Sequence, residues 1–558
     1  MIGGSANNAQ LADAGAAWWH DAVIYECHLP SFRDGNGDGI GDLDGLVASL
    51  DYLGSTLGID AIWTGPFYRS PLLDQGFDVS DYTDVEPTFG TLDTFDRLIC
   101  EAHARGLRII IDYIPNHTSD QHPWFVESRS SLMNPKRHWY VWRDPAPGGG
   151  VPNNWMSEAG GSVWEWDDQT GQYYLHSHLK EQPDLNWRTA DVRTTMLDVL
   201  RFWLGRGADG IRIDVAHMLM KDPGFRDNPS APEGNDNMFD LQHPDFGIQL
   251  HIHDRRHPDT HEVLAQIRAV VDEYPGTVTI AEIEAMPWED WARYYGSAMD
   301  GMHLPFPFRL LETPWRADLL RFELEALYES MPDGGWPTIA LGNHDRVRLA
   351  TRLGAAQARV AAVMLLTLAA TPCLLYGDEL GLIEQAVPIA RQRDYFARAT
   401  GGVTRDPTRT PMPWNGGPNA GFSTAGESDL WLPVAHNADD VNVDVQLTNP
   451  ASFLSMYRDL LRLRTASSAL RRGKIAFLPG TSSRDSVLAY LRTSPIDQKI
   501  VALNLVDAPT AVRVPSAGTV AISTTARGAG ETVGPVLRLA ANEAVVIDVP
   551  KELRHEDH

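Results

Sequence analysis

The chain has 558 residues, 43% of them hydrophobic and 22% charged, and its 47 Lys and Arg against 74 Asp and Glu give a formal net charge of −27. This composition excludes a disordered, collagen-like or coiled-coil chain. The acid excess disfavours anionic partners, so we expect neither nucleic acid nor a membrane surface to bind. A neutral or cationic partner fits better.

Three further features bear on the class of protein. The first 15 residues, MIGGSANNAQLADAG, lack the basic and apolar segments of a secretory signal, which favours a cytoplasmic protein. Cys27, Cys100 and Cys373 are odd in number and lie in apolar surroundings, so we expect reduced core residues. The longest apolar run, Val360 to Leu375, is too short to cross a bilayer and predicts a helix followed by a buried strand. We expect a monomer or a homodimer.

Short strands rich in β-branched residues alternate with amphipathic helices over most of the chain. This alternation is typical of βα units around a parallel sheet, in which catalytic groups lie at the carboxyl ends of the strands. The clearest helices are Thr94–Arg105 and Val192–Arg206. The clearest strands, in chain order, are Ala22–Tyr25, Ala61–Thr64, Arg108–Tyr113, Gly210–Asp214, Thr277–Ala281, Thr338–Leu341 and Pro372–Tyr376.

The alternation is interrupted twice and then ends. A long segment, Thr118 to Asn186, is rich in Trp, Pro and Gly and predicts an inserted subdomain. A second irregular segment, Asp378 to Pro433, follows the last strand. After a helix over Ala451–Ala469, short alternating runs predict an antiparallel β domain: Val487–Leu491, Ile500–Val506, Ala511–Val514 and Ala544–Val549. The predicted division is a barrel over residues 1–117 and 187–470, the subdomain over 118–186 and the C-terminal domain over 471–558.

Four segments at strand ends carry acids with His or Arg beside them. They are DYIPNH (Asp112–His117), GIRIDVAH (Gly210–His217), IAEIE (Ile280–Glu284) and LGNHD (Leu341–Asp345). Converging carboxylates suit cleavage of a glycosidic bond, where one acid attacks the anomeric carbon and another protonates the leaving oxygen. Each segment alone is a weak signal, but the four in this order are a strong one.

The sequence resembles glycoside hydrolase family 13, the α-amylase superfamily, and within it the α-glucosidase and oligo-1,6-glucosidase group. The resemblance runs from about Trp18 to the C-terminus and includes the four segments. It implies a (β/α)8 TIM barrel, a subdomain inserted after the third strand and a C-terminal antiparallel β-sandwich domain. It also rests on DAVIYECHLPSF, DGNGDGIGDL, QPDLN (Gln182–Asn186), LYGDELGL (Leu375–Leu382) and RTPMPW (Arg409–Trp414), of which QPDLN and RTPMPW indicate the glucosidase-like branch.

The resemblance assigns roles to the acids. Asp214 resembles the nucleophile, and Arg212, on the same face of the strand, is close enough to hold it ionised. Glu282 resembles the general acid/base, so its pKa is expected to be raised. The family's chemistry is retaining, which predicts roughly 5–5.5 Å between the two carboxyls. Asp345 resembles the third acid, which binds sugar hydroxyls in the distorted transition state.

The resemblance also implies how the sugar is held. His117 and His344 resemble a pair that hydrogen-bonds one glucosyl ring. Asp74 and Arg409 resemble an ion pair that closes the pocket behind the non-reducing end, which implies exo action on short substrates. Three further residues, Asp112, Asn116 and His217, are expected to support their neighbours without touching sugar.

The loop from Asp34 to Asp42 alternates oxygen ligands with glycines. Asp34, Asn36, Asp38, Asp42 and the carbonyl of Ile40 could wrap a hard cation, which prefers six to eight oxygens. An empty loop of Asx turns is the alternative. The family places a structural Ca²⁺, sometimes Mg²⁺, here, so we expect a bound ion remote from the chemistry and no organic cofactor.

Several positions depart from the group's usual residues. The strand-two loop has Phe77 where Tyr is common, and Ala159 and His178 stand where Phe is frequent. The first strand reads Tyr25-Glu26-Cys27-His28 instead of a Gln-Ile-Tyr run. These changes predict either an altered sugar pocket or compensated neighbours without consequence. The segment from Thr118 to Asn186 also contains Trp and His side chains that could stack against sugar, although most are expected in the subdomain core. They are Trp155, Trp164, Trp166 and His176.

The residue after the proposed nucleophile, Val215, bears on linkage. In this group Val accompanies tolerance of α-1,6 links and Thr accompanies α-1,4 preference. The sequence therefore predicts a retaining exo-α-glucosidase acting on short α-glucosides, with activity on α-1,6 or other non-α-1,4 links. A transglucosidase or glucosyl isomerase sharing every catalytic residue is the nearest alternative. A non-catalytic relative or a sugar-binding module is disfavoured because all three acids are present.

Overall fold

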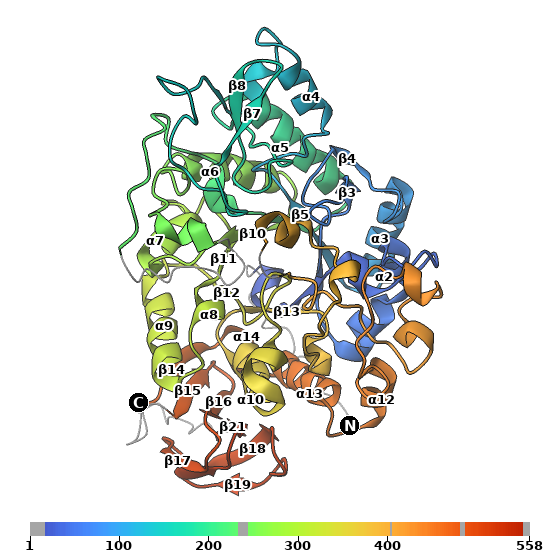
Figure 1. Ribbon diagram of the computed structural model, residues 1–558. Helices are drawn as coiled ribbons and strands as arrows, with labels where there is room; N and C mark the ends of the chain where they lie inside the picture. The colour runs from blue at the N-terminus through green and yellow to red at the C-terminus, as the bar shows by residue number, and fades with distance from the viewer. Residues whose placement is uncertain (1–16, 233–243, 402–403, 480–485, 551–558) are drawn as a thin grey trace, which may run out of the picture.

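The computed structural model describes residues 17–232, 244–401, 404–479 and 486–550, and the N-terminal residues behind the cytoplasmic expectation lie outside these ranges. Eight parallel strands form a nearly closed barrel in the order β11-β10-β9-β5-β2-β1-β13-β12, whose end strands lie side by side. The predicted TIM barrel is confirmed (Figure 1). Its strands are β1 (Ile24–Cys27), β2 (Ala61–Thr64), β5 (Arg108–Tyr113), β9 (Gly210–Ile213), β10 (Val278–Ile283), β11 (Leu304–Pro307), β12 (Thr338–Ala340) and β13 (Thr371–Leu375).

Seven of these strands match the sequence predictions, but β11 was missed. Its sequence is LPFP, and a proline within a run argues against a strand because it has no N–H to donate. Among the described residues, β11 is an end strand of the hydrogen-bonded sheet and pairs with β10 alone, with Leu304 opposite Ile280. The missing N–H groups of Pro305 and Pro307 are tolerated there because one edge of the strand forms no ladder.

Amphipathic helices surround the barrel. In α3 (Leu92–Ala104), Thr91 caps the first turn and the buried residues recur at helical spacing, which places one apolar face against the sheet. The other main helices are α2 (Leu43–Ala48), α5 (Ala190–Gly205), α6 (Thr260–Val271), α7 (Trp288–Ala292), α9 (Ala317–Ser330), α10 (Leu349–Thr367) and α13 (Phe453–Ala466).

The predicted apolar helix and strand are present as α10 and β13. Within the described part of the chain, α10 is the one helix whose length and hydropathy would suffice to cross a bilayer. It contacts α13 and the C-terminal strands β16 (Gln498–Asn504) and β21 (Ala544–Asp548), and its second half is buried. These contacts are those of a core helix between the barrel and the C-terminal strands.

The segment after β5 forms a small unit at the top of Figure 1. It contains α4 (Pro123–Ser130) and a three-stranded antiparallel sheet of β6 (Trp142–Arg143), β8 (Gln172–Leu175) and β7 (Trp164–Asp167). Trp155 and Trp164 are buried in its core, while Trp166 is 41% exposed. None of these three tryptophans lines the pocket described below, so they serve the subdomain and its surface.

The C-terminal strands form two sheets at the bottom of Figure 1. Six antiparallel strands run in the order β14-β15-β16-β21-β18-β19, and β17 pairs with β20. Apolar side chains from both sheets pack into one core, as in the predicted β-sandwich. The strands not yet given bounds are β14 (Lys474–Phe477), β15 (Val487–Thr493), β17 (Thr510–Arg513), β18 (Gly518–Ser523), β19 (Thr532–Val533) and β20 (Val536–Leu539).

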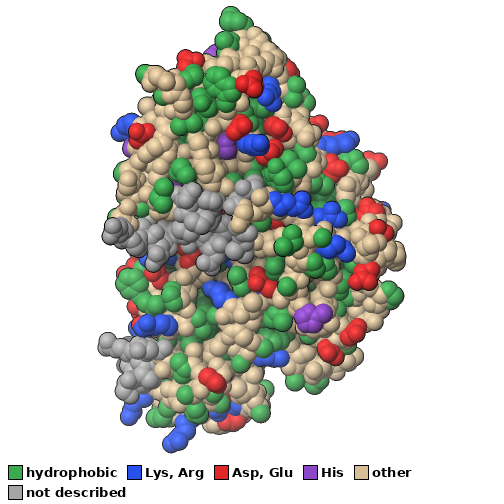
Figure 2. Space-filling view, in the orientation of Figure 1, with side chains coloured by type: hydrophobic (Ala, Val, Ile, Leu, Met, Phe, Trp, Pro, Cys, Tyr) green, Lys and Arg blue, Asp and Glu red, His purple; other side chains and the backbone are tan. Residues whose placement is uncertain are grey.

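The three predicted core cysteines differ in burial. Cys27 and Cys373 are buried free thiols, but Cys100 is exposed, so the prediction of a core residue is wrong for it. Cys100 lies on α3 beside the buried Ile99, where one helical step turns a side chain from the core to solvent. Figure 2 shows acidic side chains scattered among basic and apolar ones on the face in view.

Candidate active site

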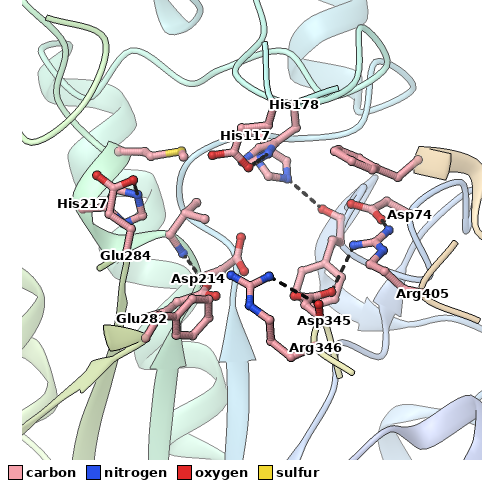
Figure 3. Close-up of a pocket in the computed structure, with 16 residues that line it drawn as sticks. Asp74, His117, His178, Asp214, His217, Glu282, Glu284, Asp345, Arg346 and Arg405 are labelled. Atoms are coloured by element: carbon pink, nitrogen blue, oxygen red, sulfur yellow. Dashed lines mark hydrogen bonds and ion pairs between the residues drawn. The ribbon is translucent and has the colours of Figure 1, made fainter. Parts of the chain in front are cut away.

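A pocket opens at the carboxyl end of the barrel and gathers the predicted acids. Asp214 directly follows β9, Glu282 lies in β10, and Asp345 lies in the loop after β12. All three line one cavity of about 120 Å³, together with Asp74 and Phe77 (Figure 3). The further lining residues are His117, Glu158, His178, Val215, His217, Met218, Glu284, Phe308, Arg346, Phe396 and Arg405.

Arg212 connects the acids on the barrel strands. Its guanidinium is 1% exposed, and Nη1 donates to Asp112 at 2.7 Å and to Asp214 at 2.8 Å. Nη2 lies 2.6 Å from Oε2 of Glu282. One buried cation therefore fixes the positions of two of the predicted catalytic carboxyls and ties them to β5 through Asp112.

Opposing effects act on the pKa of Asp214. Burial raises this pKa well above its usual value and Glu282 and Asp112 raise it further, while Arg212 and, more weakly, His178 lower it. Arg212, which favours the ionised carboxylate, is shared with Asp112 and Glu282.

The backbone at Val215 is strained. Its φ of 37° and ψ of 48° lie in the left-handed region, which a β-branched residue rarely adopts. This turn aims the amide of Val215 at Glu282, and the N–H donates to Oε2 at 3.0 Å. The strained turn therefore joins the strand end that carries Asp214 to the acid on the next strand.

Asp345 is surrounded by cations. Nη2 of Arg409 lies 2.5 Å and Nη1 of Arg405 lies 3.2 Å from its Oδ1, and Nε2 of His344 lies 3.3 Å from its Oδ2. Burial would raise the pKa of Asp345, but His344, Arg409 and Arg405 together hold it well below its ordinary value. Asp345 is thus a fixed anion in the pocket.

The ion pair that closes the pocket is not the predicted one. Nη2 of Arg405 lies 2.7 Å from Asp74 and 2.9 Å from the fully buried Asp394, whereas Arg409 binds Asp345. Figure 3 shows Arg405 between Asp74 and Asp345. The prediction chose the wrong arginine of RDPTRTPMPW, because two arginines four positions apart in an irregular loop cannot be told apart by spacing.

The pKa values of the two predicted histidines are shifted in opposite directions. Burial lowers the pKa of His117 to about 3, so its ring is neutral. Its Nε2 lies 3.2 Å from the carbonyl of Phe77 and 3.2 Å from the Gln182 amide. His344 stacks on Phe77 with ring centroids 5.6 Å apart, and its pKa is raised because Asp345 and Glu26 outweigh burial. Phe77 therefore contacts both histidines, His117 through its carbonyl and His344 through its ring, and it forms part of the pocket wall.

The inserted segment, Thr118 to Asn186, contributes charged side chains to one wall of the pocket. His178 lies 3.4 Å from Glu158, and its ring meets that of His117 edge to face at 5.1 Å. Burial would lower the pKa of His178, but Glu158 raises it above its usual value. Ala159 does not line the pocket, whereas its neighbour Glu158 does. Glu158 was not predicted from the sequence, because its importance depends on His178, which lies 20 residues later in the chain.

Charged contacts continue from this wall across β10. Arg255 donates to Glu158 at 2.8 Å and to Glu284 at 3.2 Å, and His217 lies 3.5 Å from Glu284. His217 also lines the pocket, closer to the sugar site than the sequence suggested. Asn116 accepts from Lys221 at 2.8 Å, so it supports the loop that carries His117.

The Asp34–Asp42 loop lies apart from the pocket. Among the described residues no group of three or more His, Cys, Asp or Glu side chains is arranged to hold a metal. Asp34 accepts the amides of Asn36, Gly37 and Gly39, and Asp38 accepts that of Ile40. Asp42 caps α2, and burial raises its pKa, with Asp34 and Asp38 adding to the shift. The donors are all oxygen and strongly anionic, which is the chemistry that Ca²⁺ or Mg²⁺ prefers.

Comparisons with known proteins agree with this architecture. Residues 27–473 match the family model of the alpha amylase catalytic domain. A probable alpha-glucosidase of Rhizobium meliloti (strain 1021) is 41% identical over 519 residues, covering 89% of this chain and 91% of the relative. An oligo-1,6-glucosidase of Heyndrickxia coagulans is 35% identical over 528 residues, covering 88% and 92%.

Solved structures give the same result. A crystal structure of the alpha-glucosyl transfer enzyme XgtA matches with a TM-score of 0.89 and 39% identity, covering 96% of this chain and 99% of that one. The trehalulose synthase MutB of Pseudomonas mesoacidophila MX-45 matches with a TM-score of 0.86 and 33% identity, covering 96% and 100%. The barrel, the acids at its carboxyl end and these matches together show that the chain is a glycoside hydrolase and belongs to family 13, in its α-glucosidase-like group.

Proposed function

We propose that this enzyme is a retaining, exo-acting α-glucosidase that removes terminal α-linked glucose from short oligosaccharides or α-glucosides. The observation that carries the proposal is the joining of Asp214 and Glu282 through Arg212, opposite the anionic Asp345, in one pocket. Two carboxyls on one side and a fixed anion on the other match the needs of a double displacement.

Each acid has a role in this scheme. Asp214 attacks the anomeric carbon and forms a glucosyl ester, while Glu282 gives its proton to the leaving oxygen. Glu282 then takes a proton from water, and the activated water opens the ester. Asp345 binds hydroxyls of the same ring and stabilises the positive charge that develops in the transition state.

The contacts of Arg405 support exo action. Its guanidinium contacts Asp74, Asp345 and Asp394. These contacts lie at the end of the pocket away from Glu282 (Figure 3). We propose that this salt-bridged wall admits one terminal sugar and blocks a chain that continues past it. Short substrates with a free non-reducing glucose fit this arrangement best.

The linkage preference is proposed from Val215, which lines the pocket beside Glu282. Its apolar side chain leaves space and no competing hydroxyl next to the leaving group. We expect higher kcat/KM on isomaltose or another non-α-1,4 disaccharide than on maltose. Val215→Thr keeps the size and branching and adds a hydroxyl, and we expect it to move the ratio toward maltose by roughly tenfold.

A panel of α-linked disaccharides and aryl α-glucosides, followed by product chromatography, measures the ratio of kcat/KM on non-α-1,4 substrates to that on maltose. It is run on the unchanged enzyme and on Val215→Thr. Val215→Ile is the matched control, because it stays apolar and β-branched and should leave the preference on the non-α-1,4 side. Maltose as the best substrate of the unchanged enzyme would contradict the linkage proposal, and release of products other than glucose would contradict exo action.

Glucosyl transfer is the second candidate. A sugar hydroxyl can replace water at the glucosyl ester, and two structural neighbours carry the names of a glucosyl transfer enzyme and a trehalulose synthase. Glu158 and His178 line the pocket and offer an acceptor and a donor to a second sugar, and Arg255 holds Glu158 in place. New disaccharides formed at high sugar concentration in the same panel would favour this alternative.

A bound Ca²⁺ or Mg²⁺ at the Asp34–Asp42 loop is also proposed. Support comes from three carboxylates close in the loop, of which Asp34 and Asp38 raise the pKa of Asp42, and from the Asn36 side chain, which contacts Asp38. Chelation should lower the thermal midpoint by on the order of 3–8 °C, and added Ca²⁺ should restore it. Asp38→Asn should remove the response while sparing the Asp42 cap of α2. An identical midpoint with chelator and with Ca²⁺ would contradict a structural ion.

A further inference from the structure

Glu26 is a buried carboxylate behind the pocket. It lies in β1 at the carboxyl end of the barrel and is 2% exposed. Its Oε1 accepts hydrogen bonds from Nδ1 and from the backbone N–H of His344, the latter at 3.2 Å. Its Oε2 has no hydrogen-bond partner within the described part of the chain. The hydrogen bonds of the Glu26 side chain to described residues thus all go to one residue, His344.

The other side of the imidazole faces Asp345. Nε2 of His344 lies 3.3 Å from Oδ2 of Asp345, which is itself held by Arg409. The ring is clamped from its faces and edge, since Phe77 stacks on it and Trp63 meets it at 6.1 Å. His344 therefore bridges two carboxylates, one in the pocket and one behind it, in a fixed orientation.

Two carboxylate neighbours impose a protonation state. A neutral imidazole has one N–H, so it can donate to only one of Glu26 and Asp345 and must turn a lone pair toward the other. An imidazolium donates to both. Burial lowers the pKa of His344, but Asp345 and Glu26 raise it above its usual value. The geometry and the charges agree on the doubly protonated ring.

Other groups around the ring do not change this balance. Arg409, from the loop after β13, opposes protonation of His344. Asp112, on β5, interacts with His344 as an opposite charge. His28, which follows β1, has its pKa lowered by burial and by Arg409, so it adds no positive charge near neutral pH. Among the charged neighbours of the ring, Asp345 and Glu26 have larger effects on the pKa of His344 than Arg409 has.

We propose that Glu26 is a positioning residue that keeps His344 protonated on both nitrogens, so that its Nε2–H always points at Asp345 and the sugar hydroxyls. This inference rests on the proposed function of the pocket. A glutamine at this position could still accept from Nδ1, but it would leave Nε2 free to lose its proton. The negative charge of Glu26, in addition to its hydrogen bond, is what secures the donor on the sugar side.

Removing the charge of Glu26 should change how activity depends on pH, and the direction of that change follows from the charges. A histidine whose pKa is raised in the folded protein keeps its donor at low pH and loses it as the pH rises through that pKa. Removing the Glu26 charge lowers the pKa of His344 by about one unit or more, the usual effect of an opposite charge in contact. Binding of the transition state should then weaken at a lower pH than in the unchanged enzyme.

Glu26→Gln tests this, because it keeps the shape and the acceptor oxygen. We expect the alkaline limb of the kcat/KM–pH profile to move down by about one pH unit or more, with a larger loss at pH 8 than at pH 5. Glu379→Gln is the matched control, since Glu379 is equally buried, binds Tyr25 and lies outside the pocket. A Glu26→Gln profile that keeps its shape, whether full or uniformly reduced, would overturn the proposal.

A second measurement reads the protonation state of His344 in the unchanged enzyme and does not depend on the substrate. In ¹⁵N-histidine-labelled enzyme, the His344 signals, identified by their loss in His344→Gln, should show both ring nitrogens protonated at pH 7. A neutral ring at pH 7 would overturn the proposal even if the enzyme hydrolyses α-glucosides. Failure to find any α-glucoside substrate would instead contradict the proposed function and leave this readout in place.

Discussion

Asp214→Asn is expected to lose α-glucosidase activity by roughly 10⁴-fold or more in kcat, because no other side chain can form the glucosyl ester. Asparagine keeps the size and can still contact Arg212, which donates to Asp214 at 2.8 Å. The measurement is kcat on an aryl α-glucoside and on a disaccharide, with substrate binding followed separately by calorimetry. Binding that persists while turnover is lost would identify a defect in chemistry.

A smaller side chain makes the Asp214 experiment sharper. Asp214→Ala opens space for a small anion next to the anomeric carbon, and added azide should then attack directly and give β-glucosyl azide. The thermal midpoint serves as the control, because removing Asp214 leaves Arg212 with Asp112 and Glu282 as partners. Turnover by Asp214→Ala near that of the unchanged enzyme would exclude this residue as the nucleophile.

Glu282→Gln is expected to show the second largest effect, and one that depends on the leaving group. Without a proton donor, disaccharide cleavage should fall by roughly 10²–10⁴-fold. Aryl glucosides with good phenolate leaving groups should lose much less in the first step, because they need little protonation. The measurement is the ratio of kcat/KM for the two substrate types in the variant and in the unchanged enzyme.

Azide distinguishes the two acids. In Glu282→Gln the glucosyl ester on Asp214 still forms, so azide should accelerate turnover and give α-glucosyl azide, the opposite anomer to that from Asp214→Ala. Glu284→Gln is the matched control, since Glu284 lies two residues away and is bound by Arg255 and Arg256 instead. An equal loss on both substrate types would contradict the role of Glu282 as acid.

The sequence was sufficient where short motifs fix local geometry. Asp214, Glu282 and Asp345 each lie at or just after a strand, so their convergence follows from the parallel barrel alone. The helices and strands were predictable for the same reason, since their apolar spacing is local. The one missed barrel strand, Leu304–Pro307, has a composition that is acceptable only because its free edge forms no ladder.

Long-range pairings were not predictable. Which arginine reaches Asp74 depends on the path of the loop after β13, and the structure selects Arg405. The raised pKa of Asp214 depends on its burial and on its distance from Glu282 and Asp112 on other strands, which spacing does not encode. The departures at Glu26 and His178 gain a meaning only when their partners, His344 and Glu158, are placed beside them.

If Asp214 is the nucleophile and Glu282 the acid/base, glucose leaves with its α configuration after two displacements at the anomeric carbon. Proton NMR during the first minutes of hydrolysis of an aryl α-glucoside reads this configuration directly, before mutarotation mixes the anomers. We expect α-glucose to appear first and β-glucose only later, at the rate of mutarotation. Initial release of β-glucose would contradict the retaining mechanism.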